Sequence, residues 1–203
     1  MFSSVIQRLN DRRSAAGETG EDAGFTLIEL MVVLLILAIL LAIAIPTFLG
    51  VTKSANDRAA QSNLNTALVN AKAQFQQNGQ SYTGGTAPLT PATLATAEPS
   101  LSFQAGVSTG QGNISVYVSS DGNGIVLTSF SKSGNCWILA DNTQTITNAP
   151  TINPTTYVGA TAPGLVPLAA GTQYGKVTGT TSAACGSGLA LTGATFSTTG
   201  FPS

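Results

Sequence analysis

The chain has no histidine and very little charge. Of its 203 residues, eight are Lys or Arg and nine are Asp or Glu, so 8% are charged, against about 25% in an ordinary soluble domain. The lack of histidine excludes His-based catalytic triads, His proton shuttles and His metal ligands. The net charge of -1 argues against DNA or RNA binding, because phosphate neutralisation needs clustered Lys and Arg.

The acidic residues beyond position 50 give no catalytic pair and no metal site. Asp57, Glu98, Asp121 and Asp141 are far apart in the sequence. The segment that starts at Asp121 reads DGNG and could offer oxygens to calcium. It falls far short of an EF-hand pattern, however, and a hairpin turn explains it better. We therefore expect no enzyme activity, no metal and no cofactor.

Most of the large apolar residues lie in one segment near the N-terminus. Residues 25–50 read FTLIELMVVLLILAILLAIAIPTFLG, and Glu29 is the only charged residue among them. As a helix, residues 25–49 would reach roughly 37 Å, which is enough to cross a bilayer core. A cleaved secretory signal is one alternative, although its apolar region is usually only about 7–15 residues long. A plain signal anchor is another. We favour a transmembrane helix.

Glu29 is the informative residue of this segment. A carboxylate inside a membrane helix costs about 2.5–3.5 kcal/mol at the helix centre and less near an interface. Such a residue therefore indicates a functional role with a positive partner, but no Lys or Arg lies within one helical turn of it. The partner could come from another chain. It could also be a new amino terminus made by cutting the chain between Gly24 and Phe25, where polar sequence becomes apolar.

The stretch GFTLIELMVV at positions 24–33 resembles the N-terminus of type IV pilins and of the pseudopilins of type II secretion systems. The resemblance implies that a membrane-embedded prepilin peptidase cuts between Gly24 and Phe25 and N-methylates Phe25. It also implies that Glu29 neutralises the N-terminal amine of a neighbouring subunit during assembly. Pro46 matches the position of the family's helix kink.

By this resemblance the chain is a structural subunit of a filament that serves adhesion, surface motility or DNA uptake. The implied partners are further copies of the chain, minor pilins, the prepilin peptidase and an inner-membrane assembly platform. The subunit would cross the cytoplasmic membrane once with its head outside, and would then enter an extracellular filament. No direct nucleic-acid site is evident. A secretion pseudopilin and a signal-anchored surface domain that never polymerises are the alternatives.

The pattern beyond the apolar run predicts that the helix continues into a globular head. Lys53 to Gln77 contains no Gly or Pro, and its apolar residues recur at i, i+3, i+4 and i+7. These residues are Ala60, Leu64, Ala67, Leu68, Ala71 and Phe75, and the opposite surface includes Asp57 and Asn63. We expect this stripe to pack on the sheet of the same domain, and Asn78-Gly79 to end the helix.

We predict an α+β fold in which the long N-terminal helix packs on an antiparallel β-sheet head. The expected strands are 114–118, 125–131 and 136–139, and a short helix over 91–97 is capped by Thr90. Turns are expected at 121–124, at 133–135 and at Asp141-Asn142, and residues 143–203 should hold short strands and long loops. The expected segments are a leader (1–24), a transmembrane and assembly helix (25–50), its amphipathic half (51–78), a variable loop (79–112) and the sheet head (113–203).

Both cysteines, Cys136 and Cys185, lie in the predicted head. An even number of cysteines in an exported domain suggests a disulfide. The bond would close a loop of about 50 residues, worth roughly 4 kcal/mol in the chain-entropy model. The pilin resemblance also implies a bond that fixes the C-terminal segment to the sheet. Two reduced thiols are the alternative.

Overall fold

The computed structural model describes residues 25–84, 89–119, 121–144, 170–186 and 194–202. The expected leader, including Gly24, lies outside these residues. The chain divides into two compact units, one ending at Phe48 and the other covering Leu49–Ser203, which we call the head unit. The elements are α2 (Leu27–Gln77), α3 (Pro91–Ala97), β1 (Ser102–Gln104), β2 (Asn113–Val118), β3 (Gly124–Phe130), β4 (Cys136–Asn142), β5 (Gly171–Val177), the 3-10 helix η1 (Ser182–Ala184) and β6 (Thr195–Ser197).

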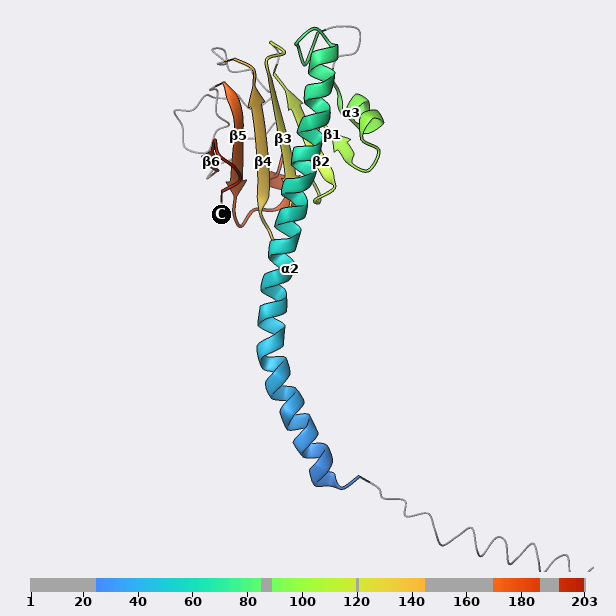
Figure 1. Ribbon diagram of the computed structural model, residues 1–203, viewed down its shortest axis with the longest axis vertical. Helices are drawn as coiled ribbons and strands as arrows, with labels where there is room; N and C mark the ends of the chain where they lie inside the picture. The colour runs from blue at the N-terminus through green and yellow to red at the C-terminus, as the bar shows by residue number, and fades with distance from the viewer. Residues whose placement is uncertain (1–24, 85–88, 120, 145–169, 187–193, 203) are drawn as a thin grey trace, which may run out of the picture. The chain divides into compact units, whose positions relative to one another are not determined.

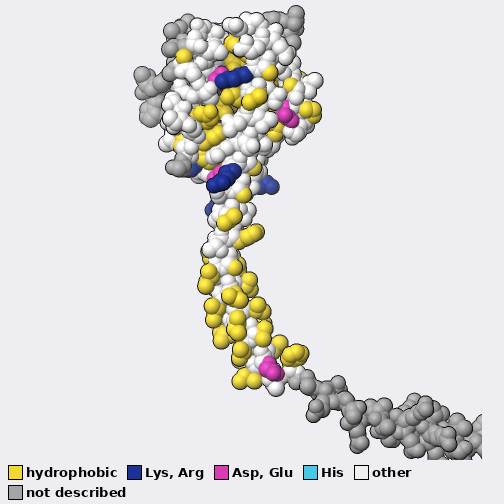
Figure 2. All heavy atoms as spheres, viewed as in Figure 1, with side chains coloured by type: hydrophobic (Ala, Val, Ile, Leu, Met, Phe, Trp, Pro, Cys, Tyr) yellow, Lys and Arg dark blue, Asp and Glu magenta, His cyan; other side chains and the backbone are white. Residues whose placement is uncertain are grey.

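The first unit contains the N-terminal part of α2, whose large apolar side chains from Leu27 to Phe48 are exposed. Figure 2 shows hydrophobic side chains all along this part of the helix. By length and composition, α2 is the one helix among the described residues that could cross a membrane. A soluble protein would bury such a surface, so these side chains need a cover that the described residues do not supply.

In the head unit, α2 packs on one face of the sheet through the predicted stripe. All six stripe residues are buried, and they share a core with Ile114, Val116, Ile125 and Leu127 of β2 and β3. Figure 1 shows this part of α2 lying over the sheet, with α3 beside β1. Because the stripe has helical spacing and the strands place alternate residues on that face, each element buries one side against the other.

The sheet has six strands in the order β1-β2-β3-β4-β5-β6. The predicted antiparallel pairing is confirmed from β2 to β6. The exception is β1, which pairs parallel with β2, so that Phe103 lies opposite Ile114. We did not predict β1, because a strand of three residues next to a Gly-rich loop shows no alternation of apolar and polar residues.

Several predicted element bounds agree closely with the structure, and one turn is wrong. Helix α3 spans Pro91–Ala97, and Thr90 caps it together with Thr93 in a reciprocal capping box. The expected turn at Asp141-Asn142 is instead the end of β4, which pairs with Gly124 and Ile125 of β3 on one side and with Gly171 and Thr172 of β5 on the other. Asp141 is tolerated in a buried strand because its carboxylate has partners from three other segments, described below.

Candidate functional site

The N-terminus of α2 is closed by a capping box that contains Glu29. Thr26 immediately precedes the helix, and its hydroxyl oxygen accepts a hydrogen bond from the Glu29 backbone N–H at 3.3 Å. In return, the Glu29 carboxylate accepts from the backbone N–H and from the hydroxyl of Thr26, both at 2.8 Å. Reciprocal bonds of this kind satisfy N–H groups that have no partner within the helix. They hold the Glu29 carboxylate at the helix end, beside the fully exposed Phe25.

The carboxylate of Glu29 has no cationic partner within the described part of the chain, where the only ion pair joins Lys72 and Asp141. The helix N-terminus carries a partial positive charge, which stabilises an acidic side chain in the first turn. Glu29 therefore tolerates its position in the isolated chain, yet one of its oxygens makes none of the bonds to Thr26 described above. The arrangement leaves room for a positive group from elsewhere.

In the head unit, Asp57 connects α2 to the β3–β4 turn and to β4. Its carboxylate accepts from the Ser133 hydroxyl, from Asn135 Nδ2 at 3.0 Å and from Trp137 Nε1 at 3.0 Å. Burial alone would raise the pKa of Asp57, but hydrogen bonds from Ser131, Ser133, Trp137 and Asn135 outweigh it and lower the pKa. Asp57 was expected on the solvent side of the helix, and instead it fixes the helix to the sheet.

A buried carboxylate, Asp141, lies at the opposite end of β4. Lys72 of α2 places its Nζ 2.9 Å from Asp141 Oδ1, and the Tyr82 hydroxyl donates to Oδ2 at 3.1 Å. Thr172 of β5 also donates to this carboxylate. Burial and the nearby Asp141 charge raise the pKa of Tyr82, so its hydroxyl remains a donor. These contacts join α2, the loop after it and two strands at one point.

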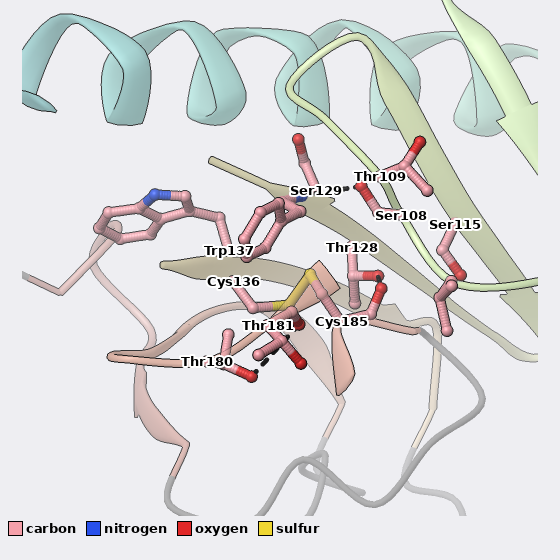
Figure 3. The surroundings of a disulfide bond; sticks show 12 residues. Ser108, Thr109, Ser115, Thr128, Ser129, Cys136, Trp137, Thr180, Thr181 and Cys185 are labelled. Atoms are coloured by element: carbon pink, nitrogen blue, oxygen red, sulfur yellow. Dashed lines mark hydrogen bonds between the residues drawn. A yellow bond between two sulfur atoms is a disulfide. The ribbon is translucent and has the colours of Figure 1, made fainter. Parts of the chain in front are cut away.

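The Cys136–Cys185 disulfide is confirmed, and it lies on the face of the sheet that does not contact α2 (Figure 3). Both cysteines are fully buried, together with Val126, Ile138 and Ala140. The backbone around Cys185 also reaches another segment, because its carbonyl accepts from the Ser108 N–H at 2.7 Å. The bond therefore attaches the C-terminal segment both to β4 and, through Ser108, to the loop before β2.

Comparison with known proteins supports the sequence resemblance. Residues 21–45 match a family described as the prokaryotic N-terminal methylation motif. The N-terminal segment of the chain is therefore similar to a prokaryotic N-terminal methylation motif. The chain is also 40% identical over 80 residues to the type IV wide pilus major component PilA4 of Thermus thermophilus, a match that covers 39% of this chain and 60% of that protein. The chain thus spans less than two thirds of this relative's length. No solved structure matches.

Of the residues expected to serve in a pilin, the structure brings together Phe25 and Glu29 at the helix end, whereas Gly24 lies outside the described residues. Pro46 lies further along α2. Next to it, the Thr47 hydroxyl donates to the carbonyls of Ile43 and Ala44 at 3.2 and 2.9 Å. A proline removes one backbone donor from a helix, and the expected kink there stays a prediction.

The sequence analysis missed the role of Thr26. The signal was present, because Thr-x-x-Glu immediately before an apolar run is typical of a capping box. The Glu29 carboxylate thus has a second property besides its charge, because it completes the cap at the N-terminus of α2. The carboxylate that we expect to serve in assembly is therefore already oriented by its own chain.

Proposed function

We propose that the chain is the structural subunit of a type IV pilus-like filament. The observation that carries this proposal is the long exposed apolar part of α2, from Leu27 to Leu49, whose single carboxylate lies in the first turn of the helix. An apolar helix surface of this length is stable in a lipid bilayer or against other copies of itself. The similarity to a major pilus component favours a filament that serves adhesion, surface motility or DNA uptake.

In the proposed order of events, the subunit is first inserted in the cytoplasmic membrane. The apolar part of α2 crosses this membrane once, and the head unit lies outside. A prepilin peptidase cuts between Gly24 and Phe25 and N-methylates Phe25. The assembly platform then transfers the subunit into a filament with other copies and with minor pilins. The match to the N-terminal methylation motif covers the cleavage position and is the support for this order of events.

The proposed chemistry of assembly is the pairing of two charges that each lack a good partner in the free subunit. Cleavage leaves a positive amine on Phe25, next to the positive end of the α2 dipole, where it is disfavoured. The Glu29 carboxylate of an adjacent subunit can neutralise this amine, and the attraction is strong where apolar helices exclude water. Since Thr26 already holds the carboxylate at the helix end, little side-chain entropy is lost on pairing.

The substitution Glu29→Gln tests this chemistry, because Gln at this position can still complete a capping box but carries no charge. In cells with the peptidase, we expect the variant to reach the membrane at the normal level and to form at least about tenfold fewer filaments, as expected for the loss of roughly 1.4 kcal/mol per contact. Filaments are counted in sheared fractions and by electron microscopy.

The matched control is Glu98→Gln, which makes the same chemical change at the end of α3 in the head unit. It should leave the filament number unchanged. Normal filaments with Glu29→Gln would refute the pairing role of Glu29.

A further inference from the structure

Four of the five cations among the described residues gather at one end of the head unit. Two of them are on α2, where Lys53 lies one helical turn before Asp57 and Arg58 directly follows it. Lys132 precedes Ser133, which donates to Asp57. Lys176 pairs in register with Trp137 and places its Nζ 5.1 Å from the centre of that ring. We name Lys53, Arg58, Lys132 and Lys176 the basal collar, and Figure 2 shows Lys and Arg side chains concentrated in this region.

The charge of the basal collar is not neutralised within the described part of the chain. Lys53, Arg58 and Lys132 are exposed, and Lys176 is half-buried. Asp57, the only nearby carboxylate among the described residues, uses its oxygens to accept from Ser133, Asn135 and Trp137. The only ion pair in the described residues lies at the other end of β4, between Lys72 and Asp141. The collar therefore keeps a local excess of positive charge, whereas the rest of the described residues carry few charges.

The collar follows directly on the apolar part of α2. Lys53 is four residues beyond Leu49 on the same continuous helix, which corresponds to a rise of about 6 Å. Asp57, around which the collar is built, is about 12 Å beyond Leu49 by the same measure. When residues 25–49 span a bilayer, Lys53 and Arg58 follow the membrane segment by only four and nine residues in the sequence, which brings them to the lipid headgroups or within about one Debye length of them.

From these positions we infer that the basal collar binds the headgroups of anionic phospholipids while α2 is in the bilayer. This inference rests on the proposed membrane insertion of the subunit. Cations next to a membrane segment are attracted to anionic lipid surfaces, and each adds to the attraction. The contact would fix the head unit against the membrane before assembly, and would be lost when the helix leaves the bilayer. Anionic lipid would therefore slow the extraction of the subunit.

An acidic surface on a second copy fits the collar less well. At the end of the sheet opposite the collar, Asp141 is already paired with Lys72, and Asp121 is held by Ser119 and by the Asn123 N–H. Both of these carboxylates therefore already have partners within the chain, whereas the collar has four cations. A lipid surface offers many anionic groups at the required depth. The inference accordingly commits to phospholipid.

The single tryptophan of the chain, Trp137, lies inside the collar and provides an intrinsic probe. The full chain is reconstituted into vesicles of phosphatidylcholine alone, or of equal parts phosphatidylcholine and phosphatidylglycerol, each with a nitroxide on a fraction of the headgroups. We expect stronger quenching of Trp137 fluorescence in the anionic vesicles. The difference should disappear at about 1 M salt, where the Debye length is about 3 Å.

The test variant is Lys53→Gln combined with Lys132→Gln, which removes two collar charges without touching Trp137 or Asp57. Because the cations act roughly additively, the excess quenching in anionic vesicles should fall by about half or more. The matched control is Gln77→Glu combined with Gln80→Glu, which changes the net charge equally at the far end of α2 and should keep the full excess.

Vesicle flotation separates the two proposals. If the chain does not float with either vesicle, the proposed membrane insertion is wrong, and the collar inference is overturned with it. If the chain floats with both vesicles but quenching is equal in neutral and anionic lipid, only the collar inference is overturned. Equal quenching combined with fewer filaments from the Lys53→Gln, Lys132→Gln variant would instead assign the collar to a second copy of the chain.

Discussion

Asp57 illustrates how a single side chain fixes the position of α2 on the sheet. It lies on the helix, yet three side chains of the β3–β4 turn and β4 donate to it. The stripe residues bury apolar area but make no directional bonds. The hydrogen bonds to the Asp57 carboxylate fix how far α2 is rotated about its axis and shifted along it relative to the sheet. The sequence could not reveal this role, because an Asp on the polar side of an amphipathic helix usually faces solvent, and its partners lie more than 70 residues away.

We predict that Asp57→Asn destabilises the head unit by about 1–3 kcal/mol, because the amide cannot accept from all three donors and one of them loses its partner. The pKa of Asp57 is lowered on folding from its ordinary value of 3.8. Its contribution is therefore complete above the unfolded pKa and is lost as the pH falls through the lower folded value. The stability difference between wild type and variant, measured by urea unfolding, should be constant above about pH 4 and shrink below it.

Asp121→Asn is the control, since that carboxylate lies in an exposed turn and should contribute less than about 1 kcal/mol. A difference between wild type and Asp57→Asn that grows as the pH falls would contradict this account.

At the scale of elements, the packing of the C-terminal strand β6 on β5 depends on a glycine of β5. Gly175 of β5 pairs with Phe196 of β6, and the Phe196 ring lies directly on the glycine. A Cβ atom at position 175 would approach two ring carbons at 2.6 and 2.9 Å, and the Ile138 Cβ at 3.1 Å. Contacts this short force a neighbour to move. The aromatic ring thus occupies space that only a glycine leaves open.

We predict that Gly175→Ala displaces the Phe196 ring and costs about 1–3 kcal/mol, as overpacking does elsewhere in protein cores. Thermal unfolding would measure the loss of stability, and hydrogen exchange would locate it. The amides of β6 should lose protection first. The control is Gly106→Ala, because a Cβ at position 106 meets nothing within 4 Å. Equal stability of the two variants would show that the ring adjusts without cost.

The Cys136–Cys185 disulfide should contribute a large part of the stability of the head unit. The two cysteines are 49 residues apart, and closing a loop of this size is worth roughly 4 kcal/mol in the chain-entropy model. The variant Cys136→Ala, Cys185→Ala should therefore lower the free energy of unfolding by about 3–5 kcal/mol. It should also expose the amide of Ser108 to exchange, because this amide donates to the Cys185 carbonyl.

Urea unfolding of the oxidised wild type, the reduced wild type and the double variant measures this effect. The reduced wild type should resemble the variant. A loss below about 1 kcal/mol, small beside the expectation for such a loop, would show that packing alone holds the C-terminal segment.

Elements with local signals could be predicted from the sequence, and elements defined by distant contacts could not. Helix α3 has its cap, its Pro in the first turn and its end within nine residues, and its bounds were predicted correctly. Strands β2 and β3 are rich in β-branched residues and flank a clear turn. Strand β1 and the end of β4 depend on partners outside the element itself. These are Asn113–Ser115 for β1 and Lys72, Tyr82 and Thr172 for Asp141.

In the candidate site, too, features with local signals could be predicted and features that depend on distant contacts could not. Glu29 could be singled out because one carboxylate in a long apolar run is costly and conspicuous. Its bonds to Thr26 lie within four residues and could have been predicted from the capping pattern. The basal collar could not be predicted from the sequence, because Lys132 and Lys176 come close to Lys53 and Arg58 only when the sheet has formed.

On the scale of the whole molecule, the low charge of the sequence has a specific distribution. The described part of the chain divides into an exposed apolar helix with one carboxylate and a head unit whose cations are concentrated at one end. Within the head unit, Asp57 and Asp141 carry structural bonds and are not available as a general surface charge. Such a chain is suited to insertion and assembly, and it offers little charge for other partners.

The central claim is that the chain is cut between Gly24 and Phe25 and then assembled. The most direct test is the N-terminal residue and intact mass of the protein taken from cells that contain the prepilin peptidase. The account predicts a chain that begins at Phe25 and carries one additional methyl group on its amine. A chain that still begins at Met1 in such cells would contradict it.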